Sequence, residues 1–348
     1  MPVRPSTAEI AQAAQLLRAG KLVAFPTETV YGLGANALDA MAVARIYAVK
    51  RRPATSPLIV HVSSIEMARS LAAGSYGWPD APDRLARKFW PGPLTFVLPK
   101  ADAIPLTVTA GLGTVGLRMP SHPVALELIC AAGLPVAAPS ANRFTELSPT
   151  TAEHVRRSLG EDVDYILDGG PCEVGIESTV ISLAGPRPVL LRPGGISRAE
   201  LAEIVGSIDL AVAPEGGAHP APGMHARHYS PRTPLLLVAN GELPGRGRGV
   251  YLQHTRTAQR SRVHERGERQ EGERQPGELQ PARLQQVGVQ LVSIRQMPQS
   301  APDYAARLYS ALHEADEENV DWIAIDLPPM SPEWEAVHDR LRRAASKE

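Results

Sequence analysis

Three cationic side chains lie where a helix or a strand is expected to end, and together they could hold phosphate groups. Lys50 and Arg52 close a helix that begins near Asp39, and Pro53 follows them directly. Arg192 follows a short apolar strand in the phrase LLRPGG. Because the residue before a proline disfavours helical geometry, the chain must turn here, and cations on a rigid turn suit phosphate oxygens. Complementation of the helix dipole is the simpler alternative for the first two cations.

Short polar side chains adjoin several other predicted strands. Thr29 lies in PTETVYGLGAN, whose two glycines let the backbone approach a ligand closely. Arg118 ends an otherwise apolar strand, a position where α/β proteins place ligand groups. Loops on a rigid scaffold commonly supply such contacts, and ordinary turn chemistry is the alternative explanation. Further candidates of this kind are Ser140, Asn142, Ser148 and Ser178.

The sequence lacks the motifs of nucleophilic and zinc-dependent catalysis. It contains no GxxxxGK[ST], HExxH, CxxC or GxSxG pattern, and VYGLG does not complete GxGxxG. His225 and His228 have HxxH spacing, but no further ligands follow at suitable distances, so no protein metal site is predicted. An enzyme with this sequence would work by positioning its substrates and neutralising their charge.

Short apolar strands alternate with capped helices as far as residue 200. Strands are predicted at 22–25, 58–62, 94–98, 115–117, 136–138, 165–167, 179–183 and 189–191. Four pairs have capping-box spacing: Ser6 with Glu9, Ser63 with Glu66, Thr150 with Glu153 and Ser197 with Glu200. Some strands follow one another without an intervening helix, so we expect a large mixed sheet rather than a regular βαβ repeat.

Composition predicts two α/β domains joined by a linker. The first domain spans 1–209, and a linker rich in Pro, Gly and His spans 210–233. The second, smaller domain spans 234–348, with Ser331 as the expected N-cap of its last helix. Its strands are predicted near 235–238, 250–252, 289–294 and 322–325, and its helices at 303–313 and 332–344. The segment 255–283, dominated by Arg, Glu, Gln and Gly, is expected to be a disordered insertion.

Bulk composition narrows the class of protein. Hydrophobic residues make up 43% of the 348, and no run approaches the roughly 18 apolar residues of a membrane helix. Cys130 and Cys172 are the two cysteines, which excludes a disulfide framework and favours a cytoplasmic location. A net charge of -1 disfavours a dedicated nucleic-acid binder, since such proteins usually carry a basic face. Small anionic ligands need only a few cations.

Taken together, the polar segments resemble one family. PTETVYGLG, KRRP, SPLIVHV, FWPGPLTFVL, VGLRMPSH, PSANRFTELSPTT, GIESTVISL and LRPGG look like a YrdC-like domain, and PGMHARHYSP with the α/β tail resembles the family's long, two-domain form. The resemblance implies a large twisted mixed sheet with flanking helices, plus a Rossmann-like C-terminal domain. It also implies a nucleotidyltransferase that joins L-threonine, bicarbonate and ATP into threonylcarbamoyl-AMP and pyrophosphate. That product serves the threonylcarbamoyladenosine modification of tRNA next to the anticodon.

The resemblance also implies roles for individual residues. Lys50 and Arg52 would be catalytic. The expected threonine site is formed by Thr29, His61, Arg118, Ser178 and the backbone at Ala138. The expected ATP site is formed by Arg52, Ser56, Thr114, Ser140, Asn142, Ser148 and Arg192, with Tyr229 and Ser230 contributed by a linker that folds over it. Position 56 is serine where the family often has asparagine. Mg²⁺ is expected to accompany ATP, and the product to pass to tRNA threonylcarbamoyl-transfer machinery, without stable tRNA or membrane binding.

Two alternatives remain open at this point. A carbamoyl-transfer enzyme of the YrdC-like group is one, but such proteins usually carry zinc-finger or acylphosphatase-like regions, and the two cysteines here do not form that pattern. An RNA-binding protein with a concave basic face is the other, which a salt-dependent affinity for tRNA in the absence of ATP would indicate.

Overall fold

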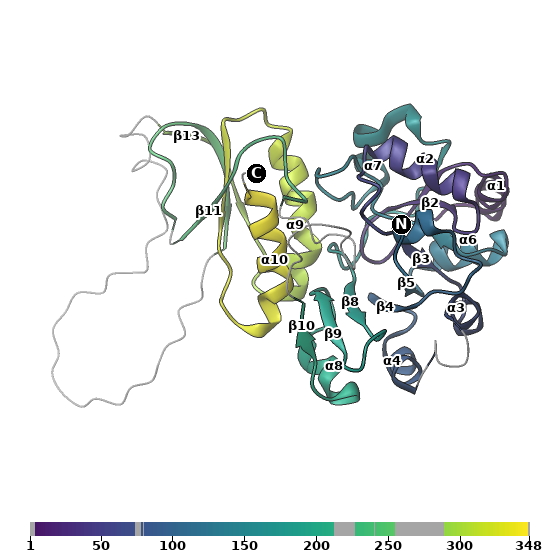
Figure 1. The fold of residues 1–348 in the computed structure, drawn as a ribbon. Coiled ribbons are helices and arrows are strands. Elements are labelled where there is room, and N and C mark those ends of the chain that lie inside the picture. The colour runs from purple at the N-terminus through teal and green to yellow at the C-terminus, as the bar shows by residue number, and fades with distance from the viewer. Residues whose placement is uncertain are drawn as a thin grey trace.

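In the part of the chain that the structure describes, the strands form two separate sheets, one of ten strands and one of four (Figure 1). The computed structural model describes residues 4–73, 78, 80–211, 227–239, 241–254 and 289–346. The predicted fold class, a large mixed sheet with flanking helices and a smaller α/β unit, is confirmed. The expected insertion at 255–283 and most of the linker lie outside the described residues. The domain boundaries at 209 and 234 stay predictions.

The first sheet mixes parallel and antiparallel pairs, as the sequence predicted. Its order is β10-β9-β8-β4-β5-β3-β6-β2-β1-β7. β3 runs parallel to β5, whereas β4 runs antiparallel to β5 and parallel to β8. The strands are β1 (Val23–Phe25), β2 (Gly32–Asn36), β3 (Ile59–His61), β4 (Leu94–Pro99), β5 (Thr114–Arg118), β6 (Val136–Ala137), β7 (Tyr165–Ile166), β8 (Thr179–Ser182), β9 (Val189–Arg192) and β10 (Asp209–Leu210).

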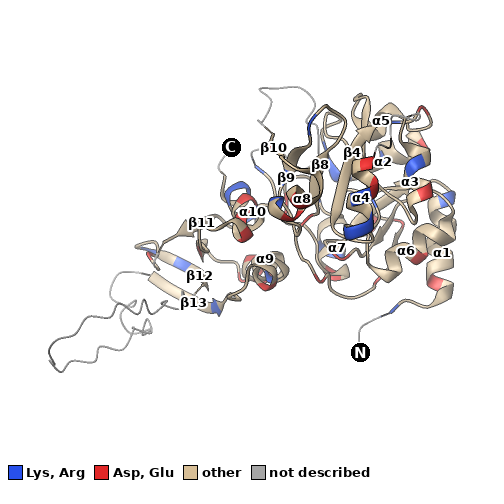
Figure 2. Cartoon of the chain, turned by 90° about the horizontal axis from the view of Figure 1, so that it is seen from below, with Lys and Arg blue, Asp and Glu red and all other residues tan. Residues whose placement is uncertain are grey.

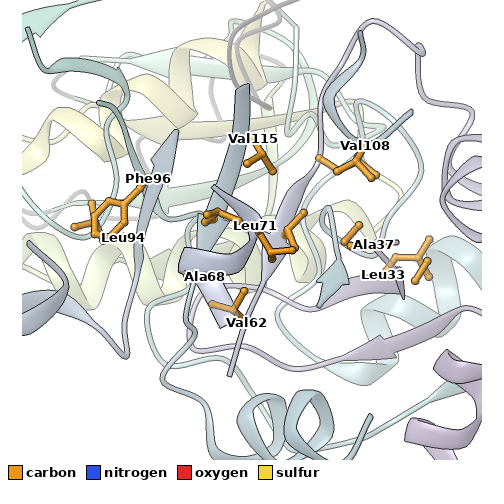
Figure 3. Packing of buried hydrophobic residues seen from close by; sticks show 14 of the residues in the cluster. Leu33, Ala37, Val62, Ala68, Leu71, Leu94, Phe96, Val108 and Val115 are labelled. Carbon is orange, nitrogen blue, oxygen red and sulfur yellow. The ribbon is translucent and has the colours of Figure 1, made fainter. Parts of the chain in front are cut away.

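Apolar side chains on both faces of this sheet are covered by helices. Val23 and Phe25 pack with α1 and α6, while Leu22 and Ala24 belong to the larger cluster that includes α2 and α3. Figure 3 shows part of that larger cluster, in which Ala68 and Leu71 of α3 lie near the sheet. The helices are α1 (Thr7–Arg18), α2 (Ala40–Lys50), α3 (Ile65–Leu71), α4 (Asp80–Phe89), α5 (Leu106–Thr109), α6 (Pro123–Ala132), α7 (Ala152–Leu159), η1 (Gly160–Asp162) and α8 (Arg198–Val205).

The second sheet is entirely parallel, and its helices face the first unit. Its order is β11-β14-β12-β13, and α9 and α10 lie between it and strands β8–β10 in both views (Figures 1 and 2). Buried side chains of the first unit, Leu147 and Ile176 among them, share one apolar cluster with α9 and α10. The elements are β11 (Leu235–Val238), β12 (Gly247–Gln253), β13 (Val289–Gln296), α9 (Ala301–Asp316), β14 (Trp322–Asp326), η3 (Pro332–Trp334) and α10 (Glu335–Ala345).

Strand β2 was not predicted, because its sequence GLGAN contains two glycines that weaken the strand pattern. Its backbone pairs with both β1 and β6. A β-carbon on Gly34 would lie 2.8 Å from Phe25 Cε1 and 2.9 Å from Val136 Cγ1. This glycine therefore serves close packing within the sheet rather than access for a ligand. The two-residue strand β10 was also not predicted.

Of the four predicted capping boxes, two are confirmed and two are displaced by one residue. Ser6 and Ser197 form the expected capping boxes. α3 is capped by Ser64 and α7 by Thr151, one residue later than the spacing from Glu66 and Glu153 suggested. In both places two adjacent hydroxyl residues could serve, and packing selects the second.

The last helical segment begins where it was predicted, with Ser331 at the N-cap and Pro332 after it, but its first turn is the 3-10 turn η3. The Ser331 hydroxyl donates to the Glu333 carboxylate at 2.7 Å and makes no capping hydrogen bond. Among the described residues, no helix is both long enough and apolar enough to cross a bilayer.

Candidate active site

A cavity of about 50 Å³ lies at one edge of the first sheet, where several strands begin or end. β3 ends at His61 and β5 at Arg118, and these two residues pair directly in register. β8 begins after Ser178, and β9 ends at Arg192. The topology thus gathers segments that are far apart in sequence. The lining residues are Thr27, Thr29, Val30, Gly32, Arg52, Ile59, His61, Arg118, Ala138, Pro139, Ser140, Glu177, Ser178, Arg192, His228 and Tyr229.

The end of helix α2 turns two of its three consecutive cations inward. Arg51 adopts a left-handed conformation (φ 53°) and is exposed, while Lys50 and Arg52 are buried on either side of it. Lys50 Nζ donates to the carbonyl oxygens of Ser140, at 2.6 Å, and of Asn142. Burial lowers the pKa of Lys50 well below its usual value. Lys50 therefore fastens the loop that carries two predicted ATP ligands.

Arg52 reaches the cavity from the same turn. Its Nε donates to the Ser56 carbonyl at 3.3 Å, and its Nη2 donates to the Pro57 carbonyl at 3.1 Å. Burial lowers its pKa to about 10, so the guanidinium remains charged at neutral pH. A charged group held by two backbone carbonyls on a fixed turn is suited to bind an anion.

Arg118 is held at the cavity by a carboxylate that sequence analysis did not single out. Its Nη2 lies 2.7 Å from Glu28 Oε1, and both side chains are buried. Glu28 Oε2 accepts a hydrogen bond from the Ser121 N–H at 3.1 Å. The Nη2–Oε1 contact is an ion pair without hydrogen-bond geometry, and Arg118 Nε likewise has no hydrogen-bond partner among the described residues. A buried N–H donor without a partner is costly, and a bound acceptor would remove that cost.

His61 presents a neutral imidazole beside Arg118. Burial, reinforced by the charge of Arg118, lowers the pKa of His61 to about 3. Within the part of the chain that the structure describes, its Nδ1 has no hydrogen-bond partner. The ring packs edge-on against Phe25, with the ring centroids 6.1 Å apart. His61 can therefore offer a hydrogen bond to a ligand without adding charge.

Two pairs of hydroxyls lie at the cavity. Thr27 Oγ1 and Thr29 Oγ1 are 2.8 Å apart, and Thr27 donates to the Val30 carbonyl at 2.6 Å. Ser178 Oγ is 2.8 Å from Thr95 Oγ1. Since Thr29 and Ser178 are fully buried and line the cavity, each could fix the orientation of a small polar ligand.

Arg192 and Glu177 fix the other side of the cavity. The Ser178 carbonyl accepts hydrogen bonds from Arg192 Nε at 3.1 Å and Nη2 at 3.0 Å. The Glu177 carboxylate accepts a hydrogen bond from Ser148 Oγ at 2.5 Å. Burial lowers the pKa of Arg192 from its usual value. Burial alone would raise the pKa of Glu177, but the charges of Arg340 and Arg192, together with hydrogen bonds from Ser148 and Arg340, lower it. Ser148 thus contacts the cavity wall through Glu177.

The end of the linker forms the roof of the cavity. His228 and Tyr229 line it, and Tyr229 is buried in a left-handed conformation with φ 63°. The next residue, Ser230, bonds through its N–H to the Thr145 carbonyl at 2.8 Å. Ser230 lines a separate cavity with His154 and His313 rather than this one.

Most of the predicted site residues meet at this cavity, and a few do not. Lys50 and Ser148 do not line the cavity, but each forms a hydrogen bond to a residue that does: Lys50 to Ser140 and Ser148 to Glu177. Asn142 bonds through Nδ2 to two carbonyls of its own loop, and Ser56 is fully buried beneath Arg52. Thr114 begins β5, about 13 Å along the strand from Arg118. The roles of all the predicted site residues stay predictions, and the structure places Ser56, Thr114, Asn142 and Ser230 away from the cavity lining.

Sequence analysis missed several of the residues at the site. Glu28 lies inside the quoted PTET phrase, and Glu177 lies inside GIEST, yet neither was assigned a role. An acidic residue in an otherwise apolar or hydroxyl-rich strand end was the available signal. His228 was considered only as one half of an HxxH pair, whose other half, His225, lies outside the described residues.

Comparison with known proteins identifies the family of this chain. The family model Sua5/YciO/YrdC, described as "Telomere recombination", matches residues 15–194. The chain belongs to the Sua5/YciO/YrdC family. A second model, "Threonylcarbamoyl-AMP synthase, C-terminal domain", matches residues 196–346. The resemblance stated from the motifs is therefore confirmed, including the long form with a C-terminal domain.

Relatives within the Sua5/YciO/YrdC family align along nearly the whole chain. The threonylcarbamoyl-AMP synthase of Bacillus subtilis strain 168 is 42% identical over 340 residues, which cover 97% of this chain and 93% of the relative. The threonylcarbamoyl-AMP synthase of Schizosaccharomyces pombe is 36% identical over 99% of this chain and 90% of its own. A crystal structure of Pyrococcus abyssi Sua5 complexed with L-threonine superposes with a TM-score of 0.81 at 36% identity, covering 99% and 96% of the two chains.

Proposed function

We propose that this protein is an L-threonylcarbamoyladenylate synthase, which converts L-threonine, bicarbonate or CO₂, and ATP into threonylcarbamoyl-AMP and pyrophosphate. The observation that carries the proposal is a cavity lined by arginines, in which buried hydrogen-bond donors have no acceptor. Arg118 Nε and His61 Nδ1 have no hydrogen-bond partner among the described residues, and Arg52 and Arg192 line the same cavity. The names of full-length relatives support this activity over carbamoyl transfer.

Threonine would bind next to the sheet edge. Its carboxylate would accept hydrogen bonds from Arg118 Nε and His61, which satisfies two buried donors at once. Thr29 or Ser178 would bond its hydroxyl, which excludes valine more sharply than size alone could. Serine lacks one methyl group, a difference worth roughly 1–3 kcal/mol in a fitted pocket. Glu28 would keep Arg118 in place from the opposite side.

The chemistry then needs no nucleophile from the protein. The threonine amine adds to the carbon of CO₂ and releases a proton, or adds to the carbon of bicarbonate with loss of one water molecule, and either route gives a carbamate. A carbamate oxygen attacks the α-phosphorus of ATP, and the bond from that phosphorus to the oxygen bridging to the β-phosphate breaks. Pyrophosphate leaves with the bonding pair. The absence of a nucleophile motif in the sequence agrees with this course.

The side chains would neutralise charge, orient the bound substrates and exclude water. Arg52 and Arg192 would neutralise phosphate oxygens as negative charge moves to the leaving group. Lys50 would act through the loop it fastens, which carries Ser140 and Asn142. Correct orientation of two bound reactants can lower a barrier by up to roughly 7–11 kcal/mol. A dry cavity also protects the carbamate from water.

The roof of the cavity must open for ATP to enter. A cavity of about 50 Å³ is small beside the roughly 300–1,000 Å³ of pockets that bind ligands of comparable size to a nucleotide. Tyr229 fills the roof at 1% exposure. We therefore expect residues 228–230 to move outward for ATP and to close over it, in agreement with the linker role expected from the sequence.

Mg²⁺ fits this site as a companion of ATP rather than as a resident of the protein. Among the described residues, no group of three or more His, Cys, Asp or Glu side chains could hold a metal. Mg²⁺ commonly binds substrate phosphates and several waters, with few protein ligands. When bound, it would shield phosphate charge. The tRNA threonylcarbamoyl-transfer machinery as recipient of the product, and a cytoplasmic location, belong to the same proposal.

The test is direct turnover. Purified protein would be incubated with ATP, Mg²⁺, bicarbonate and labelled threonine, while pyrophosphate release is followed and the adenylate is detected by mass spectrometry. We expect both products, each dependent on threonine and on bicarbonate. ATP turnover that ignores threonine would overturn the proposal and indicate another adenylating or carbamoylating reaction. No turnover by folded protein, with salt-dependent tRNA affinity, would favour RNA binding instead.

A further inference from the structure

Arg340 of helix α10 is a buried arginine whose principal partners lie in the other unit of the molecule. It is 0% exposed. Its Nε donates to Glu177 Oε2 at 2.7 Å, and its Nη2 donates to the Pro193 carbonyl at 3.0 Å and to the Glu177 carbonyl at 3.4 Å. Asp339, its partner within α10, takes only Nη1. The guanidinium therefore crosses the interface between the two sheets.

The two segments that Arg340 joins both end at the candidate active site. Glu177 directly precedes Ser178, and Pro193 directly follows Arg192. The backbones of these two segments are in close contact at Gly194 and Thr179. A β-carbon on Gly194 would lie only 2.3 Å from the Thr179 nitrogen. A displacement of Glu177 or Pro193 would consequently be passed to the Ser178 hydroxyl and the Arg192 guanidinium.

Two further elements of the site meet the same cluster. The Arg340 guanidinium carbon lies 5.2 Å from the ring centroid of Tyr229, in the roof of the cavity. The Glu177 carboxylate that Arg340 binds also accepts hydrogen bonds from Tyr309 of α9, at 3.0 Å, and from Ser148, at 2.5 Å. The Glu177 carboxylate and the Arg340 guanidinium thus connect Tyr229 in the roof, the segments that lead to Ser178 and Arg192, and helices α9 and α10.

We propose that Arg340 is a positioning residue through which the C-terminal unit sets the geometry of the active site. The inference rests on the proposed synthase activity. An ion pair buried this deeply seldom adds net stability compared with apolar side chains of the same volume. Apolar packing of α9 and α10 on Leu147 and Ile176 already joins the units. The ion pair instead fixes the orientation of the joined segments, because the donors of a planar guanidinium hold several acceptors at set angles.

The test compares variants of the full-length protein. Arg340→Met keeps the length of the side chain and removes its charge and fork, Arg340→Lys keeps the charge alone, and Glu177→Gln changes the partner. Arg342→Met is the matched control, because Arg342 is an exposed arginine of the same helix. Folded fraction by circular dichroism, KM for threonine and for ATP, and kcat would be measured for each variant, with threonine binding by calorimetry.

We expect Arg340→Met to raise the KM for threonine and for ATP at least tenfold per folded molecule, and Arg340→Lys to restore only part of the loss. The double variant Arg340→Met with Glu177→Gln should be no worse than the poorer single variant, since both act through one contact. Arg342→Met should stay within twofold of wild type. Unchanged KM and kcat in folded Arg340→Met protein would overturn the proposal.

Two further results need to be distinguished from failure of the positioning role: misfolding of the Arg340→Met variant, and absence of synthase activity in the wild-type protein. If Arg340→Met does not fold, Arg340→Lys and Glu177→Gln decide, and wild-type KM values in both would overturn the positioning role. If the wild-type protein makes no threonylcarbamoyl-AMP, the proposed function fails. In that case, hydrogen exchange at residues 177–180 and 192–196 decides: faster exchange in Arg340→Met than in Arg342→Met supports the coupling, and equal rates overturn it.

Discussion

Arg118 and Glu28 form a buried ion pair, with Nη2 2.7 Å from Oε1, at the wall of the candidate active site. The ion pair leaves part of the hydrogen-bonding capacity of the guanidinium unused, because Arg118 Nε has no hydrogen-bond partner among the described residues. One side of Arg118 is therefore held by the protein, and the other is available to a ligand. This division explains how a strong cation can be kept in place in a buried site and still bind a carboxylate.

Replacing Glu28 by Gln should destabilise the protein and make it depend on threonine. The change leaves the charge of Arg118 buried without its carboxylate, and breaking a buried pair in this way costs roughly 3–5 kcal/mol. Bound threonine would supply a carboxylate in its place. Thermal unfolding should therefore show a lower Tm without ligand and a larger rise on addition of threonine than in wild type.

The control is Glu127→Gln, which breaks an exposed ion pair with Arg4. Exposed pairs are worth about 0–1 kcal/mol, so this variant should melt close to wild type with an ordinary response to threonine. Equal threonine-induced shifts in Glu28→Gln and wild-type protein would remove Arg118 from the threonine site.

Arg52→Ala should abolish ATP-dependent product formation, because it removes a buried cation from the phosphate side of the cavity. A loss of at least 100-fold in kcat/KM for ATP is expected, equivalent to about 2.7 kcal/mol of transition-state stabilisation. Arg51→Ala is the matched control: Arg51 is the exposed neighbour, and alanine keeps its β-carbon at the same positive φ. Near-normal turnover by folded Arg52→Ala protein would remove Arg52 from the ATP site.

The arrangement of strands could be predicted from local patterns, and its exceptions have local causes. Apolar runs bounded by Gly or Pro located eight of the ten strands of the first sheet and all four of the second. β2 escaped because Gly32 and Gly34 are poor strand residues, and Gly34 is required by packing against Phe25 and Val136. Such a requirement exists only once three strands are side by side, so the sequence alone could not reveal it.

The site was predictable only where its residues belong to compact motifs. Arg52, Arg118, Ser178 and Arg192 lie in short phrases that resemble one family, and the structure brings these four to one cavity. The bond between Glu177 and Arg340 joins residues 163 positions apart, and neither residue has a local pattern that names the other. Their pairing follows from how α10 docks on the first unit, which periodicity does not encode.

Helix α3 offers a direct test of which hydroxyl caps it. Ser64 Oγ accepts a hydrogen bond from the Met67 N–H at 3.1 Å, whereas the sequence spacing favoured Ser63. Ser64→Ala should therefore lower the free energy of unfolding by about 1 kcal/mol, and Ser63→Ala by less than about 0.5 kcal/mol. Urea unfolding of the two variants beside wild type measures both values. The reverse order would show that the helix starts one residue earlier.

Two stacked imidazoles at the interface of the units should make stability depend on pH. His154 of α7 and His313 of α9 lie with ring centroids 3.8 Å apart. Burial is the main cause that lowers the pKa of His154 to about 3 and that of His313 to about 4. Both rings stay neutral in the folded protein at pH 5, whereas in the unfolded chain they protonate near pH 6.5.

Between pH 6.5 and pH 4 the unfolded chain therefore binds more protons than the folded protein, and the free energy of unfolding falls as the solution is acidified. Each ring contributes at most about 1.4 kcal/mol per pH unit. His154→Phe retains an aromatic ring against His313 and removes one titrating group, so its stability should fall less steeply over this range. Urea unfolding of both proteins at pH 7, 6 and 5 measures the two slopes. Parallel curves would mean that His154 titrates alike in the folded and unfolded states.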